Sequence, residues 1–186
     1  MNMFRNFKDQ VTNQVSGAAR SSNKAVSVVF AQIPQNQAEL AALPQAAMQT
    51  PFDTAALFVA AMVVYPHNAN EALAMINFLK GPQPLSSYDQ QFIADRMRDK
   101  HYLPASYFNG ASPQNNYQPT EPYTVVVSEN PYSYDEQSYA KLYLQSSGAD
   151  SPRPIKLRLA KDGKWYLWEQ FLLADIRKPE ADNPWA

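Results

Sequence analysis

The sequence predicts an α+β fold, in which N-terminal helices pack on a C-terminal antiparallel sheet of about four strands. Between residues 36 and 100, apolar residues recur at helical spacing and are interrupted by proline and by helix-capping residues. From about residue 123 onward, short segments of alternating apolar and polar residues replace them. The length of 186 residues is typical of one domain of ordinary size.

We expect residues 1–35 to form an amphipathic helix and a connecting segment, and residues 36–186 to form a single α+β domain. In the first helix, Phe4, Phe7 and Val11 recur at spacings of three and four, which places them on one face. This face is expected to pack on its own domain or on a partner protein. Contact with a membrane surface through residues 1–24 is the less favoured alternative. The apolar, β-branched residues 25–33 fit either a strand or a continuation of the helix.

The helical half carries clear start and stop signals. Thr50 is a predicted N-cap followed by proline, and Asn68 is the predicted N-cap of the next helix. Four helices are expected: 36–43, from Thr50 to residue 65, from Asn68 to Lys80, and from Ser86 or Ser87 to about residue 100. The helix after Thr50 is apolar on nearly every face, so it should be the central core helix. In the last helix, Phe92, Ile93 and Met97 are expected to face the core.

Four strands are expected, over residues 123–128, 139–145, 155–160 and 164–169. The turn ending at Gly163 permits two registers for the last hairpin. With a three-residue loop, Leu157 faces Leu167 and Lys156 faces Trp168. We favour this register because it gives one clean apolar face and leaves cations beside aromatic rings on the other.

The composition excludes several classes of function. There is no cysteine, so the chain has neither a disulfide framework nor a thiolate metal site. Two histidines nearly exclude a multi-histidine metal centre, and five scattered glycines cannot form a phosphate-binding loop. The net charge of −1, without clustered cations, gives no reason to expect nucleic acid. We therefore expect no metal, no other cofactor and no nucleic-acid partner.

The sequence also predicts a cytoplasmic location. The first twenty residues lack the continuous apolar core of a signal peptide. The longest apolar run, over residues 55–65, is too short for a transmembrane helix, which needs about 20 residues.

Six strings carry unusual Trp, Pro and Tyr positions: FDTAALFVAA, NFLKGPQPLSSYDQQFIADRM, YFNGASPQNNY, EPYTVVVSENPYSY, SSGADSPRPIKLR and GKWYLWEQFLLADIRKP. Together they resemble a bacterial family of domains of unknown function, in which a helical half precedes a β half ending in GKWYLWE. The resemblance covers about residues 37–186. It implies this order of elements and no substrate, reaction or catalytic residue.

Because no nucleophile–base pair is evident, we expect a non-catalytic interaction or scaffold domain that binds a protein, either another copy or a different chain. Tyrosine and tryptophan are enriched at binding hot spots, and Asp150 and Arg153 lie in a proline-flanked loop that could hold a partner's charge. The candidate binding residues are Tyr107, Tyr132, Tyr134, Asp150, Arg153, Arg158, Tyr166 and Trp168. The competing interpretation is that the rings are core residues and that Asp150 and Arg153 form a structural Asp–Arg tie that fixes the loop.

The alternative function is a small enzyme or small-molecule binder, with a pocket formed by the 101–122 loop, Asp95, His101 and Arg153. An aspartate near a histidine can act as an acid–base pair, although such residues at a polar helix end more often form a solvated face. A deep pocket that holds His101 or Arg153 would favour this alternative. A flat aromatic patch would favour the interaction domain.

Overall fold

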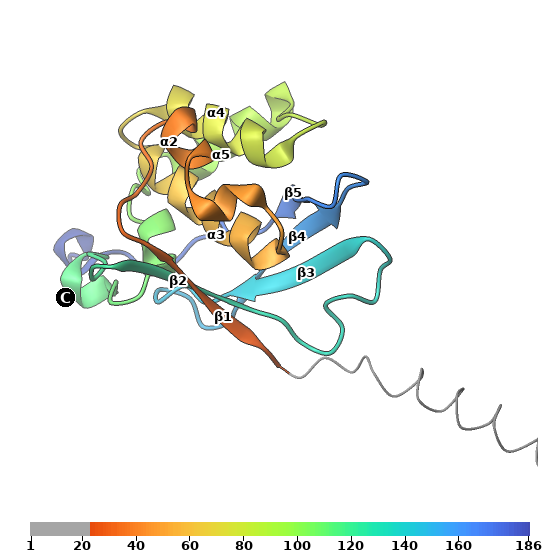
Figure 1. Cartoon of the computed structure of the whole chain (residues 1–186). Helices are drawn as coiled ribbons and strands as arrows, with labels where there is room; N and C mark the ends of the chain where they lie inside the picture. The colour runs from red at the N-terminus through yellow and green to blue at the C-terminus, as the bar shows by residue number, and fades with distance from the viewer. Residues whose placement is uncertain (1–22) are drawn as a thin grey trace, which may run out of the picture.

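The structure is a computed structural model that describes residues 23–186 (Figure 1). In these residues, four α-helices lie on one face of a five-stranded antiparallel sheet. The strands, in their order across the sheet, are β1 (Ala25–Phe30), β2 (Tyr123–Ser128), β3 (Tyr139–Leu144), β4 (Arg153–Leu159) and β5 (Trp165–Gln170). The helices are α2 (Gln37–Ala41), α3 (Pro51–Val64), α4 (Ala69–Lys80) and α5 (Ser87–Met97). The predicted α+β class is confirmed.

Short 3₁₀ helices complete the described chain: η1 (Pro44–Ala47), η2 (Pro104–Tyr107), η3 (Pro113–Asn115) and η4 (Glu180–Asp182). The predicted amphipathic helix, with Phe4, Phe7 and Val11, lies outside the described residues. Within residues 23–186, no helix combines the length and the apolar character that crossing a membrane requires.

The segment whose pattern fitted either a strand or a helix forms strand β1. It pairs with β2 over six residues, from Ala25 opposite Ser128 to Phe30 opposite Tyr123. The sheet therefore has one strand more than the four expected. In the sequence, the helices lie between β1 and β2, which are neighbours in the sheet. Alternation along β1 buries the side chains of Val28 and Phe30 against the helices. The domain boundary at residue 35 stays a prediction.

Capping side chains occupy the predicted helix starts. The side chains of Thr50 and Asn68 accept hydrogen bonds from backbone N–H groups in the first turns of α3 and α4. Ser86 and Asp89 form a reciprocal capping box at the start of α5. These bonds satisfy N–H groups that have no partner inside a helix, so the short sequence signals fix where the helices begin.

Helix α3 is the centre of the core, as its apolar composition predicts. Its residues are buried between the sheet and the other helices, except for Asp53 and Val63. The Thr54 hydroxyl donates a 2.6 Å hydrogen bond to the Trp165 carbonyl, and the Trp165 N–H donates a 2.9 Å bond to the Met48 carbonyl. These contacts attach the start of β5 to α3 and to the turn before it.

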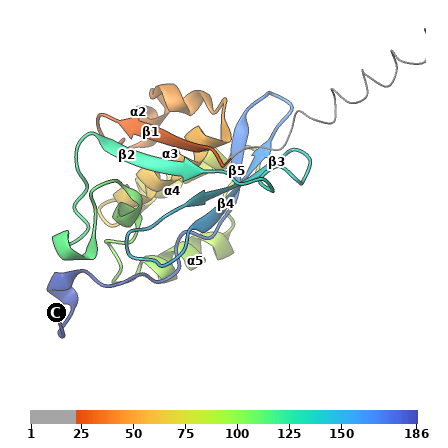
Figure 2. The ribbon, with the colours of Figure 1, turned by 90° about the horizontal axis from the view of Figure 1, so that it is seen from below.

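The last hairpin has the predicted loop, with Gly163 in the left-handed region at φ +82°. Leu157 faces Leu167, as expected from the favoured register. The expectation that Lys156 faces Trp168 is wrong, because a β-bulge places Lys156 opposite Glu169. The bulge adds Trp168 as an extra residue on β5 and bends this edge of the sheet. Seen from below, the strands lie in front of the helices, so the second face of the sheet carries none of the described α-helices (Figure 2).

Candidate functional site

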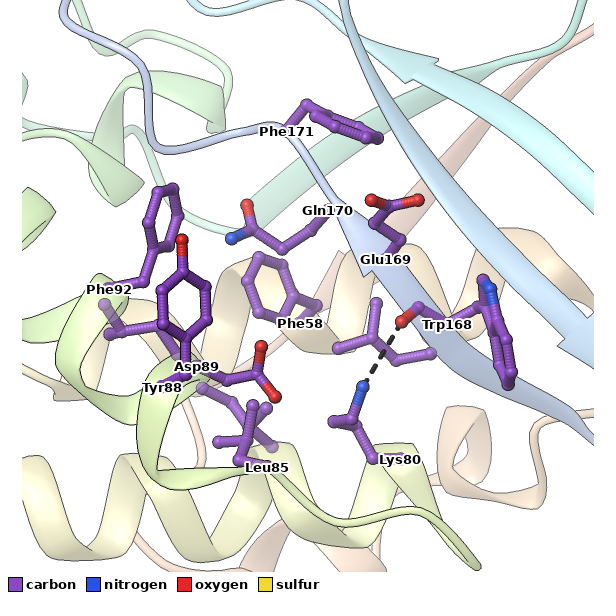
Figure 3. A pocket seen from close by; sticks show the side chains of 13 residues that line it. Phe58, Lys80, Leu85, Tyr88, Asp89, Phe92, Trp168, Glu169, Gln170 and Phe171 are labelled. Carbon is purple, nitrogen blue, oxygen red and sulfur yellow. Dashed lines mark hydrogen bonds between the residues drawn. The ribbon is translucent and has the colours of Figure 1, made fainter.

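A groove of about 280 Å³ lies between β5 and the helices (Figure 3). Its helical side is formed by Phe58, Ile76, Lys80, Leu85, Tyr88, Asp89, Phe92 and Ile93. Its strand side is formed by residues 167–171. Figure 3 shows the rings of Tyr88 and Phe92 on the helical side and the side chains of Glu169 and Phe171 on the strand side. The groove therefore follows the open edge of the sheet.

The electrostatic character of the groove comes from two carboxylates and one ammonium group. Lys80 Nζ donates a 3.2 Å hydrogen bond to the Trp168 carbonyl, which holds the lysine against β5. Partial burial acts to raise the pKa of Asp89, but hydrogen bonds from the Ser86 hydroxyl and N–H, together with the Lys80 charge, lower this pKa below its ordinary value. Glu169 adds a second, exposed carboxylate at the strand side.

On the open face of the sheet, cations stack on aromatic rings beside this groove. The Arg158 guanidinium carbon lies 4.7 Å from the ring centre of Trp168 and 5.4 Å from that of Tyr139. Lys156 Nζ lies 4.5 Å from the Tyr139 ring centre and also forms an ion pair with Glu136. The Tyr139 and Trp168 rings meet edge to face at 5.6 Å. Of the expected stacking of cations on the outer rings, the contact of Arg158 with Trp168 is confirmed, whereas Tyr166 packs against the core.

A second hollow, of about 330 Å³, lies on this open face and includes Tyr132, Tyr139 and Lys156 in its wall. Glu169 and Phe171 line both this hollow and the groove, so the two hollows adjoin at the end of β5. We call the combined region the aromatic surface and define it by Tyr88, Phe92, Tyr132, Trp168 and Phe171. Four of these five belong to the eight large apolar residues that are exposed in residues 23–186.

Comparison with protein families agrees with the resemblance stated above. A family model described as a domain of unknown function, DUF6935, matches residues 32–180. The chain belongs to this family. No curated protein and no solved structure matches the chain. Because the DUF6935 description assigns no activity, the function of this member has to be argued from its own surface.

In this DUF6935 member, Arg158 stacks on Trp168 at the groove, and Tyr132 lines the neighbouring hollow on the open face of the sheet. Two other predicted binding residues make internal contacts. Tyr107 is buried and donates a 2.5 Å hydrogen bond to the Leu172 carbonyl, and burial raises the pKa of Tyr107 to about 12. Tyr166 donates a 2.7 Å hydrogen bond to Asp162.

Tyr134 lies beside the hairpin and is half-exposed. Its ring meets the Trp165 ring edge to face at 6.4 Å. Burial and a hydrogen bond to Glu129 raise the pKa of Tyr134. This residue therefore braces the β2–β3 connection against β5, next to the aromatic surface.

Asp150 and Arg153 contact the C-terminal segment and not each other. Asp150 forms an ion pair with Arg177. The Arg153 guanidinium donates hydrogen bonds to the carbonyls of Ala174 and Asp175, with a longer one to Leu172. Both side chains thus fasten the segment after β5 to the start of β4, so their role is structural but their partners are not those of the expected Asp–Arg tie.

The pocket expected for an enzyme is only partly present. His101 lines an open cleft of about 1050 Å³ that also includes His67 and part of the 101–122 loop. Arg153 is directed to the C-terminal segment, and Asp95 bonds to Gln91 and Arg98 on its own helix. Among residues 23–186, no three His, Cys, Asp or Glu side chains are grouped to hold a metal ion.

Three residues of the aromatic surface were missed by the sequence-based prediction: Tyr88, Phe92 and Phe171. Phe92 was expected to face the core with Ile93 and Met97; those two are buried, but Phe92 is 36% exposed. The Arg96 guanidinium lies 5.1 Å from the Phe92 ring centre. A usable signal was the spacing of four between Tyr88 and Phe92, which places both rings on one face of α5.

Proposed function

We propose that this domain binds another protein through the aromatic surface and acts as an interaction or scaffold domain rather than as a catalyst. The observation that carries the proposal is that Glu169 and Phe171 line both hollows, which places the groove next to the hollow on the open sheet face. Its cytoplasmic location stays a prediction.

The composition of this surface supports a protein partner. Large aromatic rings with a polar rim are typical of protein interfaces, where tyrosine, tryptophan and arginine supply most of the binding energy. Tyr88 is 78% exposed, and Arg158 is stacked on Trp168. Tyrosine and tryptophan lose little conformational entropy on binding, because their side chains have only two torsion angles.

Site-specific photo-cross-linking tests the proposal. A photoreactive phenylalanine analogue replaces Tyr88 or Phe171 in the full chain, and Val29 serves as the matched control because it is exposed at the opposite edge of the sheet. In the producing cell, we expect the probes at positions 88 and 171 to capture the same protein and the probe at position 29 not to capture it. Identical adducts at all three positions, or none at 88 and 171, would show that the aromatic surface is not the interface.

A second candidate function, small-molecule binding, is supported by one observation at the cleft. Three of the five non-glycine residues with positive φ in the described chain, Asp99, Asn116 and Tyr117, line the cleft that contains His67 and His101. Such conformations cost about 1–3 kcal/mol each and cluster at functional sites. A fragment screen read from the imidazole NMR signals tests this candidate: fragments that shift both histidines support it, and their absence would reject it.

A further inference from the structure

We infer that the groove accepts an extended segment of the partner as an added strand along β5, and that this segment combines apolar with basic side chains. The inference rests on the proposed protein-binding function and specifies what kind of segment the groove recognises. The open backbone edge, the apolar wall and the rim charges each contribute to it.

The first argument is the direction of the backbone groups of β5. The N–H and the C=O of Trp165 both point away from β4, to the Met48 carbonyl and the Thr54 hydroxyl. In an antiparallel pair this direction repeats every second residue, so Leu167 presents its N–H and C=O to the same side. The Phe171 N–H donates to the Pro154 carbonyl of β4, so the adjacent Gln170 N–H faces the open edge. Leu167 and Gln170 both line the groove.

Lys80 limits how far a strand can pair with this edge. Its ammonium group donates a hydrogen bond to the Trp168 carbonyl. Trp168 lies between Leu167 and Gln170, whose backbone groups face the groove. Charged side chains, lysine above all, protect sheet edges against unspecific pairing, and Lys80 brings such a charge to this edge from α4. The added ladder is therefore short, and the partner's side chains must supply part of the affinity and the selectivity.

The second argument is the apolar wall that faces this edge. Phe58 and Ile93 form buried parts of the wall, while Tyr88 and Phe92 stand at its exposed rim. The groove volume of about 280 Å³ lies just below the lower limit of typical small-molecule pockets, which is about 300 Å³. Because side chains of a strand alternate, every second side chain of an added strand would enter the groove. The volume suits such single side chains better than a complete folded element.

The third argument is charge. Asp89 and Glu169 place two carboxylates on the groove against the single ammonium of Lys80, so the lining carries a net negative charge. A lysine or arginine on the partner segment would complement these carboxylates, and an acidic segment would be repelled.

The test uses a fluorescent heptapeptide that alternates lysine and valine, and a matched peptide that alternates glutamate and valine. Binding to the full chain is followed by fluorescence anisotropy and by amide NMR shifts. We expect the lysine peptide to bind more tightly than the glutamate peptide and to shift the amides of Leu167 and Gln170. Absence of binding, or shifts confined to other strands, would overturn the inference.

Two sets of variants separate charge from backbone pairing. The double variant Asp89→Asn/Glu169→Gln should weaken binding of the lysine peptide by about fivefold. The control Glu180→Gln/Asp182→Asn removes the same charge elsewhere and should leave this binding unchanged. Gln170→Pro removes the edge N–H and should weaken binding of the lysine peptide by about fivefold. Gln170→Ala keeps that N–H and serves as its control.

Because Gln170→Pro can disturb the fold, hydrogen exchange of the Leu167 and Gln170 amides in the unmodified chain provides a second measurement. Added peptide should slow exchange at both amides, and unchanged rates would contradict strand addition. If cross-linking from positions 88 and 171 persists in Gln170→Pro and in Asp89→Asn/Glu169→Gln, the domain still binds its partner, and only the added strand is rejected. Reduced cross-linking in both variants would agree with strand addition, whereas absence of cross-linking from positions 88 and 171 in the otherwise unmodified chain would reject the proposed function itself.

Discussion

The Tyr117 hydroxyl lies so close to Gly148 that a β-carbon at position 148 would stand 2.2 Å from it. The same hydroxyl donates a 2.6 Å hydrogen bond to the Arg177 carbonyl. The Tyr117 ring also stacks on the Tyr102 ring, with 5.4 Å between their centres. One buried ring thus joins the loop after α5, the β3–β4 connection and the C-terminal segment.

This contact predicts that Gly148→Ala lowers the free energy of unfolding by about 1–3 kcal/mol, the range typical of overpacked sites. Tyr117→Phe removes the hydroxyl and its hydrogen bond, at a cost of about 1 kcal/mol. In the double variant the new methyl group gains space, so the combined loss should be smaller than the sum of the two single losses. Urea unfolding followed by circular dichroism measures all three variants. Strict additivity would show that the clash with the hydroxyl does not determine the cost.

The two arginines of the predicted site should respond differently to substitution. Arg153→Lys keeps the charge but loses the planar fork that reaches several carbonyls, so it should lower the free energy of unfolding by about 1–3 kcal/mol. Arg158→Met loses mainly exposed cation–π contacts, worth about 0.5–1 kcal/mol. Thermal unfolding measures the stabilities, and cross-linking from position 171 reports binding. The hypothesis requires that Arg158→Met reduces cross-linking more than Arg153→Lys does.

Local signals made most of the fold predictable from the sequence. A capping residue acts within three positions, so Thr50 and Asn68 mark the starts of their helices whatever surrounds them. The register of Leu157 opposite Leu167 followed from the turn and from the apolar pattern of the hairpin. Strand β1 could not be assigned, because its apolar pattern fits two structures and pairing with the distant β2 decides between them.

The candidate site was less predictable because it depends on packing between distant elements. Arg158 and Trp168 belong to one hairpin, and their stacking follows from its register. Tyr88 and Phe171, in contrast, share a groove only because α5 lies across it from the end of β5. Arg153 was predicted to bind a partner but has an internal role. A charged residue between two prolines resembles part of a binding loop, and only the structure shows that Arg153 donates its hydrogen bonds to carbonyls of the C-terminal segment.

The low pKa of Asp89 predicts a pH-dependent part of the stability. The pKa lies below the ordinary value of 3.8, so the ionised carboxylate stabilises the fold above about pH 4, and this contribution is lost as the pH falls through the lowered value. Asp89→Asn should therefore cost about 0.3–1 kcal/mol at pH 7, as expected for a charge at a helix N-terminus. The difference from the unmodified chain should shrink toward pH 2.

Urea unfolding at several pH values measures this difference. Asp95→Asn is the control, because Asp95 lies further along α5, away from the capping box. A cost of Asp89→Asn that stays constant from pH 7 to pH 2 would show that the carboxylate charge does not stabilise this helix start.

Lys80 should determine whether the edge of the sheet stays protected. Lys80→Met removes the ammonium from the Trp168 carbonyl and leaves an open strand edge beside an apolar groove. We expect this variant to self-associate with rising concentration, because edge strands of two copies can then pair. Lys161→Met removes the same charge from the exposed turn of the β4–β5 hairpin and should leave the oligomeric state unchanged. Light scattering coupled to size-exclusion chromatography measures both variants, and equal masses at every concentration would show that Lys80 does not protect the edge.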